Sequence, residues 1–490
     1  MAKASDEALL APLLASYRQQ PESLGKQVRL EQALRGVIGQ GWASGGKVPS
    51  QRRLCEHLGV ARDTLARAVK TLIDEGWLVT GHGQGTWAQR PSSSVEAPGD
   101  APALSRRASA VLEKAGAGQV QSGAFVPGIP DIAHFPLRKW RSLYDSVTVP
   151  HNTLLLSYST GGYGPLKRAI RDFLQRWRGI RCDTDQIVVT EGAHQAIELC
   201  ALGLADGGDR VLLDSPCYWG ARNVFTACGL DIDQIPWHPA SGYADAVPAG
   251  DVRLAYFTGA HQYPLSAPTR LADKQRLCAR ARPDYVIEDD YEYGSDDHDN
   301  LIFDPRRADR LLVGSFSKLM FPGLRLGYLV ASKSLAAALG RLRSEVAREG
   351  RMLDQAVLAQ FIADGDLDAW YRRIRREYLA RQQVLHDRLC DLPGVVGVSP
   401  PSSAISLCLE LAPDIDDVAL ARRLLDEQLV VRPLSPACGP GDPRRGLVMG
   451  IGMVSGQTLS REAERLRVAL KRLLRGTSRA GRGELAGPGC

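Results

Sequence analysis

A single lysine stands between two serines and an apolar run in residues 314–328, which read GSFSKLMFPGLRLGY. Lysine is seldom fully buried unless it is paired, so Lys318 is either an ordinary surface residue or a residue with a chemical task. In apolar surroundings its pKa would fall, because burial disfavours the ammonium. A neutral amine attacks aldehydes, and proteins attach pyridoxal phosphate in this way. The stretch therefore predicts an attachment site for this cofactor.

The phosphate of such a cofactor requires hydroxyls, a cation or a helix N-terminus. Ser315, Ser317 and Arg325 flank the lysine and offer the first two. The stretch TEGAHQAIEL, residues 190–199, predicts a helix that begins directly after a strand. Its first amides could point at an anion, and they belong to Gly192, Ala193 and His194.

Three carboxylates, Glu288, Asp289 and Asp290, end the apolar stretch YVIEDD, 28 to 30 residues before Lys318. The pyridine nitrogen of the cofactor requires an anion beside it. Tyr291 follows directly and could donate to the ring oxygen. Taken alone, the acidic run could equally be a metal site or a solvated loop.

An aromatic face for the ring is offered by DSPCYWGAR, residues 214–222, where Tyr218 or Trp219 is the candidate. Taken alone, Tyr218 would most simply be a packing residue. All these segments, however, follow apolar stretches that predict strands, and open α/β sheets bind ligands at the carboxyl ends of their strands. Their joint position favours one cofactor site.

Short apolar stretches alternate with helical patterns such as 164–177 and 192–205. This alternation indicates βαβ units, a largely parallel sheet and hence an α/β fold. The expected strands are residues 186–190, 210–214, 254–259, 285–290, 310–317 and 324–331.

Residues 27–88 predict three helices followed by a hairpin. Apolar side chains recur at helical spacing in residues 27–40, and they are Leu30, Leu34, Val37 and Ile38. Ser50 can cap a second helix, Gly59 supplies a turn, and residues 61–76 make a third helix. Residues 77–89, WLVTGHGQGTWAQ, form a hairpin with a glycine-rich tip.

A short turn between two helices is typical of helix-turn-helix proteins, in which the N-terminal residues of the second helix meet base edges. Arginine reads guanine bidentately, and other basic residues hold phosphates. The candidate DNA contacts are Arg52, Arg62, Thr64, Arg67, Lys70 and, in the hairpin tip, Gly83. A generic three-helix bundle with a solvated basic face is the alternative.

Composition sets further bounds. The 490 residues are too many for one core. Residues 1–95 hold 12 Lys and Arg against 8 Asp and Glu, so they carry +4 of the net charge of +6, which hints at an anionic partner. The ten cysteines form no CxxC pair, so we expect no metal site. No apolar run reaches about 18 residues and the start lacks a signal-peptide core, which predicts a cytoplasmic protein without membrane contact.

A shift in composition separates the two regions. Residues 89–125 are rich in Ser, Pro, Ala and Gly and predict a linker, with a short helix near 103–115. The expected divisions are an N-terminal extension (1–26), a winged helix-turn-helix (27–88), a linker (89–124), the α/β domain (125–475) and a disordered tail (476–490).

The stretch VPSQRRLCEHLGVARDTLARAVKTLIDEGWLVTGHGQGTW, residues 48–87, resembles the winged helix-turn-helix of GntR-type bacterial repressors. The shared features are the Pro-Ser-x-Arg start, the Leu-Gly-Val-x-Arg-x-Thr turn and the Gly-x-Gly-Thr wing. The resemblance covers about 60 residues and implies binding to a double-stranded DNA operator, by analogy.

Residues 162–199, 287–293, 314–330 and 354–385 resemble the MocR/GabR regulators, which fuse a GntR-type domain to a fold type I aminotransferase domain. The resemblance runs over about 350 residues. It implies a mixed, mostly parallel sheet with a smaller C-terminal α+β subdomain. It also implies pyridoxal 5'-phosphate as cofactor and a homodimer.

The resemblance assigns roles to individual residues. Lys318 carries the aldimine, Asp289 pairs with the pyridinium, and Tyr218 stacks on the ring. Tyr291 and His261 contact the ring oxygen. The phosphate is held by Ser315, Ser317, Arg325, the amides of Gly192, Ala193 and His194, and Tyr158 of the second subunit.

Some positions depart from the family pattern. Glu191 stands where a serine is usual, and AHQYPLSA, residues 260–267, has Leu-Ser where Thr-Gly is typical. The stretch RRGLVMGIG, residues 444–452, lacks the arginine with which aminotransferases grip the substrate carboxylate, and Arg445 and Arg432 are the candidates to replace it.

These features lead to the hypothesis of a pyridoxal-phosphate-dependent transcriptional regulator that senses an amino compound through aldimine exchange at Lys318. It would be nucleoid-associated when bound to DNA. Two alternatives stay open. One is an active aminotransferase with an appended DNA-binding domain, against which the missing carboxylate arginine argues; the other is a sensor of pyridoxal phosphate itself.

Overall fold

The computed structural model divides into two compact units, Met1–Ala103 and Leu104–Cys490, each of which is described by itself. No helix in the described part of the chain is long and apolar enough to cross a membrane. The structure describes residues 2–20, 25–39, 47–81, 85–89, 104–113, 123–149, 153–157, 160–245, 250–292, 300–348, 350–454 and 456–480.

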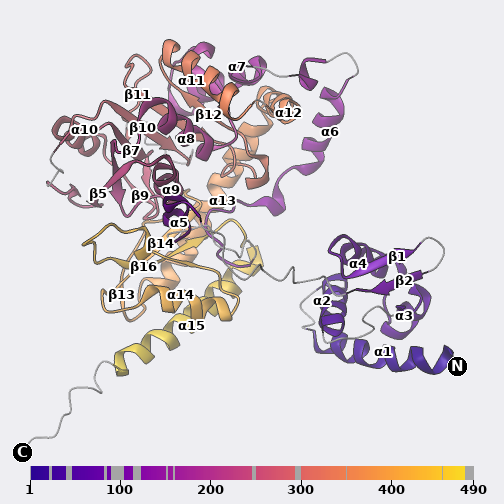
Figure 1. The fold of residues 1–490 in the computed structure, drawn as a ribbon. Helices are drawn as coiled ribbons and strands as arrows, with labels where there is room; N and C mark the ends of the chain where they lie inside the picture. The colour runs from indigo at the N-terminus through magenta and orange to yellow at the C-terminus, as the bar shows by residue number, and fades with distance from the viewer. Residues whose placement is uncertain are drawn as a thin grey trace, which may run out of the picture. The chain divides into compact units, whose positions relative to one another are not determined.

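The N-terminal unit contains the three predicted helices and the hairpin (Figure 1). Its elements are α1 (Ala2–Gln19), α2 (Lys26–Gly39), α3 (Gln51–Leu58), α4 (Arg62–Asp74), β1 (Leu78–Gly81) and β2 (Gly85–Ala88). Ser50 caps α3 by accepting from the amide of Arg53 at 3.5 Å. Gly59 ends α3 in the left-handed region, at φ +63°, which favours glycine.

Helix α1 is an element that we did not predict from the sequence. Its side chains Leu10, Leu13 and Tyr17 are buried in the same core as Leu30 and Leu34 of α2. The segment expected to be a separate N-terminal extension thus contributes one wall of the winged helix-turn-helix core.

An eight-stranded sheet forms the centre of the second unit (Figure 1). In spatial order its strands are β3 (Ile187–Thr190), β12 (Gly327–Val330), β11 (Arg310–Ser315), β10 (Tyr285–Asp290), β7 (Leu254–Thr258), β4 (Arg210–Ser215), β5 (Asp231–His238) and β6 (Gly242–Tyr243). Among these eight strands, β12 and β6 run in the opposite direction to the others. The predicted mixed, mostly parallel sheet is confirmed.

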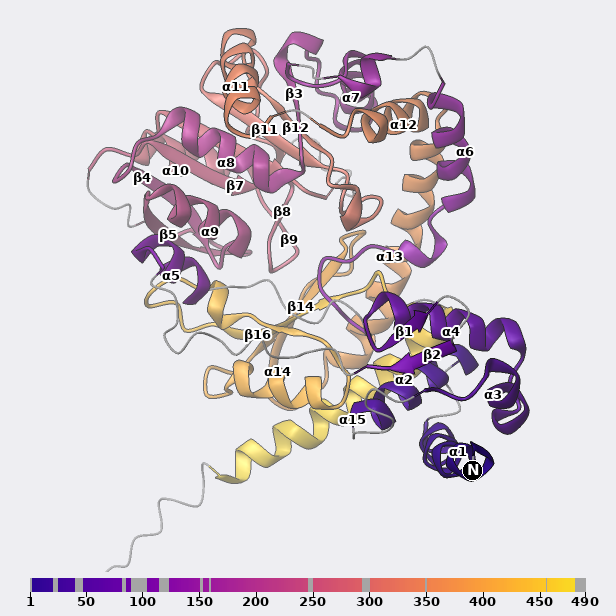
Figure 2. The same cartoon turned by 45° about the vertical axis from the view of Figure 1, so that its right-hand side comes forward.

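Helices cover the faces of this sheet (Figure 2). Residues of α8, α9 and α11 share a buried core with β3, β4, β7, β10, β11 and β12. The helices of this part are α6 (Leu137–Val147), α7 (Gly164–Arg178), α8 (Ala193–Leu204), α9 (Trp219–Cys228), α10 (Leu271–Ala281), α11 (Lys333–Val346), α12 (Met352–Ala363) and α13 (Asp366–Leu389). Short 3-10 helices lie at Ile132–His134, Thr153–Leu156, Thr184–Gln186, Pro322–Leu324 and Ser435–Ala437.

A smaller antiparallel sheet follows, as expected for the C-terminal α+β subdomain. Its strands and helices are β13 (Val395–Val398), β14 (Ser406–Leu411), β16 (Arg445–Gly450), β15 (Arg432–Pro433), α14 (Asp417–Asp426) and α15 (Gly456–Ala480). Helix α15 continues to Ala480, past residue 476 where we expected a disordered tail. A two-stranded ribbon, β8 (His261–Gln262) with β9 (Ala267–Pro268), completes the unit.

One helix forms inside the expected linker. Helix α5 (Arg106–Glu113) packs against α9, and Arg107 donates to the carbonyl of Ala227 at 3.4 Å. Residues 123–131 belong to the same unit and contact its smaller sheet, where the amide of Gly450 donates to the carbonyl of Phe125 at 2.8 Å. We call residues 123–131 the entry segment.

Candidate functional site

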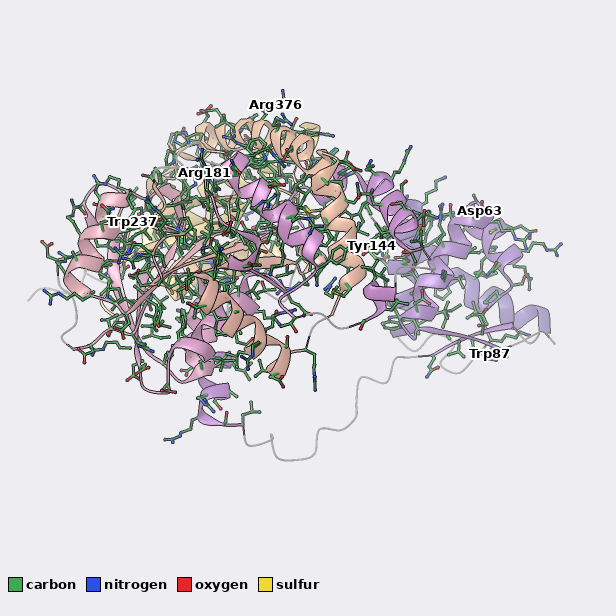
Figure 3. The ribbon with its side chains drawn as sticks, turned by 90° about the horizontal axis from the view of Figure 1, so that it is seen from above. Asp63, Trp87, Tyr144, Arg181, Trp237 and Arg376 are labelled. Atoms are coloured by element: carbon green, nitrogen blue, oxygen red, sulfur yellow. The ribbon has the colours of Figure 1, made fainter. Side chains whose placement is uncertain are left out.

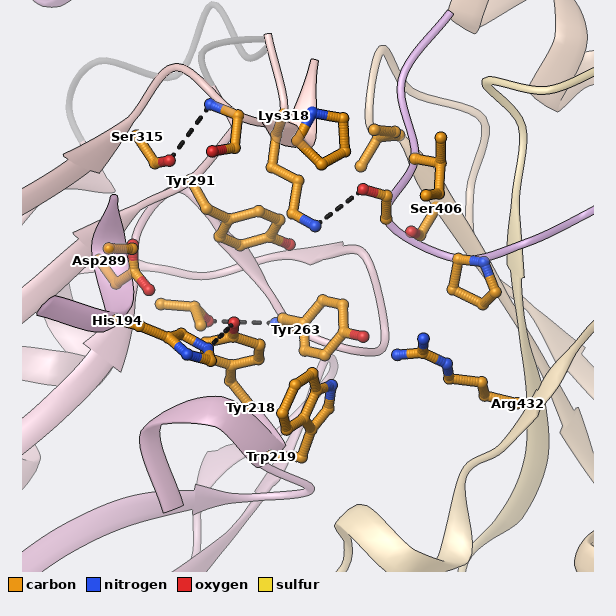
Figure 4. Close-up of a pocket in the computed structure, with 18 of the residues that line it drawn as sticks. His194, Tyr218, Trp219, Tyr263, Asp289, Tyr291, Ser315, Lys318, Ser406 and Arg432 are labelled. Atoms are coloured by element: carbon orange, nitrogen blue, oxygen red, sulfur yellow. Dashed lines mark hydrogen bonds between the residues drawn. The ribbon is translucent and has the colours of Figure 1, made fainter. Parts of the chain in front are cut away.

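A cavity of about 300 Å³ lies where the carboxyl ends of the central strands meet the smaller sheet and the entry segment (Figure 4). Open α/β sheets bind ligands at this edge, as the sequence predicted. The cavity is lined by Pro127, Gly128, Ile129, Ala193, His194, Tyr218, Trp219, Thr258, Tyr263, Asp289, Tyr291, Ser315, Ser317, Lys318, Pro322, Arg325, Ile405, Ser406 and Arg432.

Lys318 extends into this cavity from the turn after β11 (Figure 4). Its Nζ donates to the carbonyl oxygen of Gly128 in the entry segment at 2.8 Å. Burial, assisted by the Arg432 guanidinium, lowers the pKa of Lys318 to about 8. A substantial fraction of the amine is therefore neutral, and nucleophilic, near neutral pH.

This pKa sets the pH dependence of cofactor loading. We expect the initial rate of attachment to rise about tenfold per pH unit below pH 8 and to level off above it, because only the neutral amine reacts. Visible absorbance after mixing apo-protein with pyridoxal phosphate measures the rate. The rate with Nα-acetyl-lysine, divided by the neutral fraction of its own amine, corrects for titration of the cofactor. A corrected rate that still rises towards pH 10.5, the ordinary lysine pKa, would contradict the prediction.

The three carboxylates of β10 divide by strand alternation, which sends neighbouring side chains to opposite faces. Glu288 accepts from Lys274 at 2.7 Å, and Asp290 forms a bidentate pair with Arg178, with both contacts at 2.7 Å. Both ion pairs are almost fully buried. Asp289 faces the other way, into the cavity. Of the three carboxylates, Asp289 is the one without an ion pair to a buried lysine or arginine.

Asp289 is held by a neighbouring strand. The hydroxyl of Tyr256, on β7, donates to its Oδ2 at 2.7 Å, whereas its buried Oδ1 has no hydrogen-bond partner among the described residues. Burial raises the pKa of Asp289 to about 7, and the Tyr256 hydrogen bond opposes this rise. A buried carboxylate oxygen without a protein partner can accept from a cationic or donor group of a ligand.

Donors for an anion also line the cavity. The Ser317 hydroxyl is buried and has no partner in the described part of the chain, and the Ser315 hydroxyl accepts from the amide of Ser317 at 3.2 Å. The Arg325 guanidinium donates to the carbonyl of Glu191 at 2.9 Å, beside the N-terminus of α8. A Cβ on Gly192, whose φ is +87°, would lie 3.1 Å from Arg325 Nη2. The positive φ and the close approach together favour glycine at this position.

Aromatic groups form the remaining wall. His194 Nε2 and the Tyr218 hydroxyl are 2.7 Å apart. Burial and the cations of Arg325 and Lys318 lower the pKa of His194 to about 4, so the imidazole is neutral. The Tyr291 hydroxyl is buried and without a partner among the described residues. It is therefore available to a ligand oxygen.

The structure does not bring every predicted residue to the cavity. His261 is buried against Glu292, with Nδ1 3.6 Å from Oε2, and is absent from the cavity lining, where Tyr263 lies instead. Gly192 contributes through its position at the start of α8 rather than as a lining residue. Tyr158 and Gly83 lie outside the described residues.

The two carboxylate-binding candidates differ in position. Arg432, on β15, lines the cavity and pairs in register with Val448 of β16, inside the stretch that lacks the family arginine. Arg445 pairs with Leu411 at the far end of β16, away from the cavity-lining Ser406. No carboxylate among the described residues forms an ion pair with Arg432.

Sequence reasoning missed three contributors. Gly128 supplies a carbonyl to Lys318 from a segment 190 residues away. Tyr256 and Tyr263 reach the site from β7 and the turn after β8. Only the order of the strands in the sheet places them there, and the amino-acid pattern carries no signal of that order.

The N-terminal unit presents the candidate DNA contacts at its surface. Arg62 begins α4 and, like Arg67 and Lys70, is exposed, while Leu65 and Leu72 of the same helix are buried. Arg52 is exposed on α3, and Thr64 is half-buried. Figure 3 shows Asp63, next to Arg62, and Trp87 on β2. Helix α4 thus presents a polar side of mixed charge, which includes the candidate contacts Arg62, Arg67 and Lys70, to solvent.

The fold and the site define a class of protein. A mostly parallel sheet places a nucleophilic lysine, a buried aspartate and a group of anion donors around one cavity, and this is the fold type I architecture of pyridoxal-phosphate proteins. A winged helix-turn-helix precedes it in the chain.

Comparison with known proteins identifies the family. The chain belongs to the aminotransferase class I and II family, which matches residues 139–247 and 289–446. Residues 26–87 match the bacterial regulatory proteins of the gntR family. The fusion of the two is the architecture of MocR/GabR-type regulators, and the chain is a DNA-binding regulator of this type.

Similar curated proteins are regulators. One is the probable rhizopine catabolism regulatory protein MocR of Rhizobium meliloti, 28% identical over 439 residues, covering 86% of this chain and 89% of that protein. Another is the pyridoxine biosynthesis transcriptional regulator PdxR of Corynebacterium glutamicum, 28% identical over 464 residues, covering 92% and 97%.

Solved structures share the fold of the second unit. The α-aminoadipate aminotransferase LysN of Thermus thermophilus, complexed with N-(5'-phosphopyridoxyl)-L-leucine, has a TM-score of 0.63 at 24% identity, over 76% of this chain and 96% of that one. The cofactor of this domain is pyridoxal phosphate. The residues present fit it, because the buried Asp289 oxygen and the Ser317 and Tyr291 hydroxyls lack partners among the described residues.

Proposed function

We propose that this regulator senses a small amino compound at Lys318 and changes its DNA binding in response. The observation that carries the proposal is the hydrogen bond from Lys318 Nζ to Gly128 O, at 2.8 Å. Gly128 belongs to the entry segment, which follows the linker from the DNA-binding unit. The reactive amine is therefore in contact with the stretch of chain nearest in sequence to that linker.

We assign the cofactor contacts as follows. Asp289 would hold the pyridine nitrogen, Tyr218 would lie against the ring, and Tyr291 would donate to the ring oxygen. The phosphate would be held by Ser315, Ser317, Arg325 and the amides of Gly192, Ala193 and His194. When bound, pyridoxal phosphate supplies an aldehyde carbon that exchanges one amine for another.

The position of the Lys318 side chain would then depend on whether the lysine or an effector amine is attached to the cofactor. A Lys318 amine displaced by an effector is free to donate to Gly128 O. A Cβ on Gly128, whose φ is +75°, would lie 2.6 Å from Lys318 Nζ, so the two groups are in close packing contact. The two positions of Lys318 would favour different arrangements of the entry segment, and an effector shifts an equilibrium only through such a difference.

Arg432 is our candidate for holding an effector carboxylate. It lines the cavity with Lys318, and its cation contributes to the lowered pKa of that lysine. Its position opposite Val448 supports a replacement of the missing family arginine from the neighbouring strand.

We further propose a homodimer, which would bring two winged heads to two half-sites on DNA and place the protein on the nucleoid when it is bound. Large apolar side chains are exposed on α6, just after it, and on the 3-10 helix at Thr153–Leu156, and they support self-association. They are Leu137 (62% exposed), Val149 (50%) and Leu156 (82%). Light scattering at increasing protein concentration measures the oligomeric state.

Arg62 is the residue in the N-terminal unit with the strongest expected effect on specificity. If it reads a base from the start of α4, the change Arg62→Ala should weaken operator binding by about 1–3 kcal/mol and relax the preference at one base pair. Fluorescence anisotropy with the operator and with single-base variants measures both.

Arg52→Ala is the matched control. Arg52 is exposed on α3, and as a phosphate contact its loss should weaken all sequences about equally. If both changes weaken the binding of all operator variants equally, Arg62 also contacts the DNA phosphates and does not read a base.

The proposed function is tested by screening amines with the purified holo-protein. A sensing effector should alter the visible spectrum and the DNA footprint without release of a keto product. Multiple turnovers with an amino acid and a keto acid, lost in Lys318→Ala, would instead establish an aminotransferase. An operator affinity that depends on the cofactor alone would establish a sensor of pyridoxal phosphate.

A further inference from the structure

A second cavity, of about 840 Å³, adjoins the cofactor cavity. The two share three lining residues, Trp219, Tyr263 and Arg432. Figure 4 shows these three side chains on the same side of the cofactor cavity, with the Tyr263 hydroxyl directed toward Arg432. A ligand that reaches past them from the cofactor cavity enters the larger space.

The walls of the second cavity are mainly apolar. Helix α14 contributes Val418, Ala421 and Leu425, and the first and last of these are 40% and 41% exposed. The opposite wall contains prolines and small residues, and they are Pro264, Pro433, Pro436, Ala437, Gly439 and Pro440. Exposed apolar side chains that line one hollow favour an apolar ligand group.

Four charged side chains line the second cavity, and one of them stands at its boundary with the cofactor cavity. Arg432 lies at that boundary, whereas Arg222, further along, already donates to the carbonyl of Pro436 at 2.6 Å. Arg422 and Glu113 also line the second cavity. An amino acid whose nitrogen is at Lys318 and whose carboxylate is at Arg432 would direct its side chain into the larger space.

The loop that forms the opposite wall is fixed to the central sheet. Cys217 donates through its amide to Ala437 O at 2.9 Å, and Gln234 Nε2 donates to the same oxygen at 3.1 Å. The amide of Gly439 donates to Ser215 Oγ at 2.9 Å. These bonds hold the cavity open in a defined shape, so a side chain can enter at little cost in ordering the protein.

We propose that the second cavity takes the side chain of the effector, and that the effector is an α-amino acid with a long apolar side chain. The inference rests on the proposed function, since it assumes that an amine exchanges at Lys318. Binding would bury methylene groups against α14 while the carboxylate remains with Arg432.

The test is a titration of the holo-protein with alanine, norvaline, norleucine and 2-aminooctanoate, followed by the visible spectrum and by calorimetry. Burial of each methylene is expected to tighten binding about fourfold. Glutamine, whose chain is close to that of norleucine in length but ends in an amide, should bind more weakly than norleucine. Equal affinity along the series would overturn the proposal.

Two neighbouring residues of α14 provide matched variants. Val418 lines the cavity, whereas Ala419 is exposed on the same turn and does not line it. Val418→Asp should remove most of the dependence on chain length, while Ala419→Asp should behave as the parent. An unchanged dependence in Val418→Asp would contradict the assignment of this wall.

The same series of amino acids also distinguishes a failure of this inference from a failure of the proposed amine-sensing function. If short amino acids alter the spectrum as strongly as long ones, amine sensing stands and the side-chain cavity is refuted. If no amino acid of either kind alters it, the proposed function fails and the inference fails with it.

Discussion

The change Lys318→Ala should abolish covalent attachment of the cofactor and, with it, every response of DNA binding to an amine. Among the residues that the structure describes, Lys318 has the only side-chain amine that lines the cavity. Borohydride reduction followed by peptide mass analysis measures attachment. In the parent protein the added mass should lie on the peptide that contains residues 310–325, and in the variant it should be absent.

The fold should survive this change, because Lys318 extends into a cavity and its one described hydrogen bond is to Gly128 O. Lys333→Ala is the matched control, since Lys333 forms an exposed ion pair with Asp183. It should retain full attachment. Reduced cofactor recovered on another residue of Lys318→Ala would refute the assignment of the lysine.

The change Arg178→Ala should lower the free energy of unfolding of the second unit by about 3–5 kcal/mol, because it leaves the buried Asp290 without its cation. Both side chains are almost fully buried, at 0% and 1% exposure. The loss should also weaken cofactor binding, since Asp290 neighbours Asp289 on the same strand. Chemical unfolding followed by circular dichroism measures the first effect, and cofactor titration the second.

Two companion variants make this prediction specific. Arg176→Ala removes an ion pair with Asp368 that is 47% exposed on the arginine side and should cost less than about 1 kcal/mol. Adding Asp290→Asn to Arg178→Ala should recover part of the lost stability, because no charge is then left unpaired. A loss below about 1 kcal/mol in Arg178→Ala would contradict the argument.

Much of the fold followed from local patterns. All six expected strands are present, and the helix around Leu30 buries the side chains that its spacing predicted. Local sequence decides these features, because helical and strand periodicities differ. Helix α1 escaped prediction, although Leu10, Leu13 and Tyr17 recur at helical spacing, since its role depends on packing against α2.

The site was predictable in type but not in every member. Lysine, serine and arginine near residue 318 are close in sequence, so one turn and one hairpin bring them together. Gly128 and Tyr256 belong to it only through the three-dimensional arrangement of distant segments. His261 was expected at the ring, but it lies against Glu292.

Strand β10 has a consequence for how this protein can change. Alternate residues of the strand serve two separate purposes, since Glu288 and Asp290 neutralise internal cations while Asp289 faces the cofactor cavity. A deletion or insertion of one residue would exchange the two sets together, leaving Lys274 and Arg178 unpaired and two carboxylates at the cavity. Length variation within these six residues is therefore forbidden to any descendant that retains the cofactor.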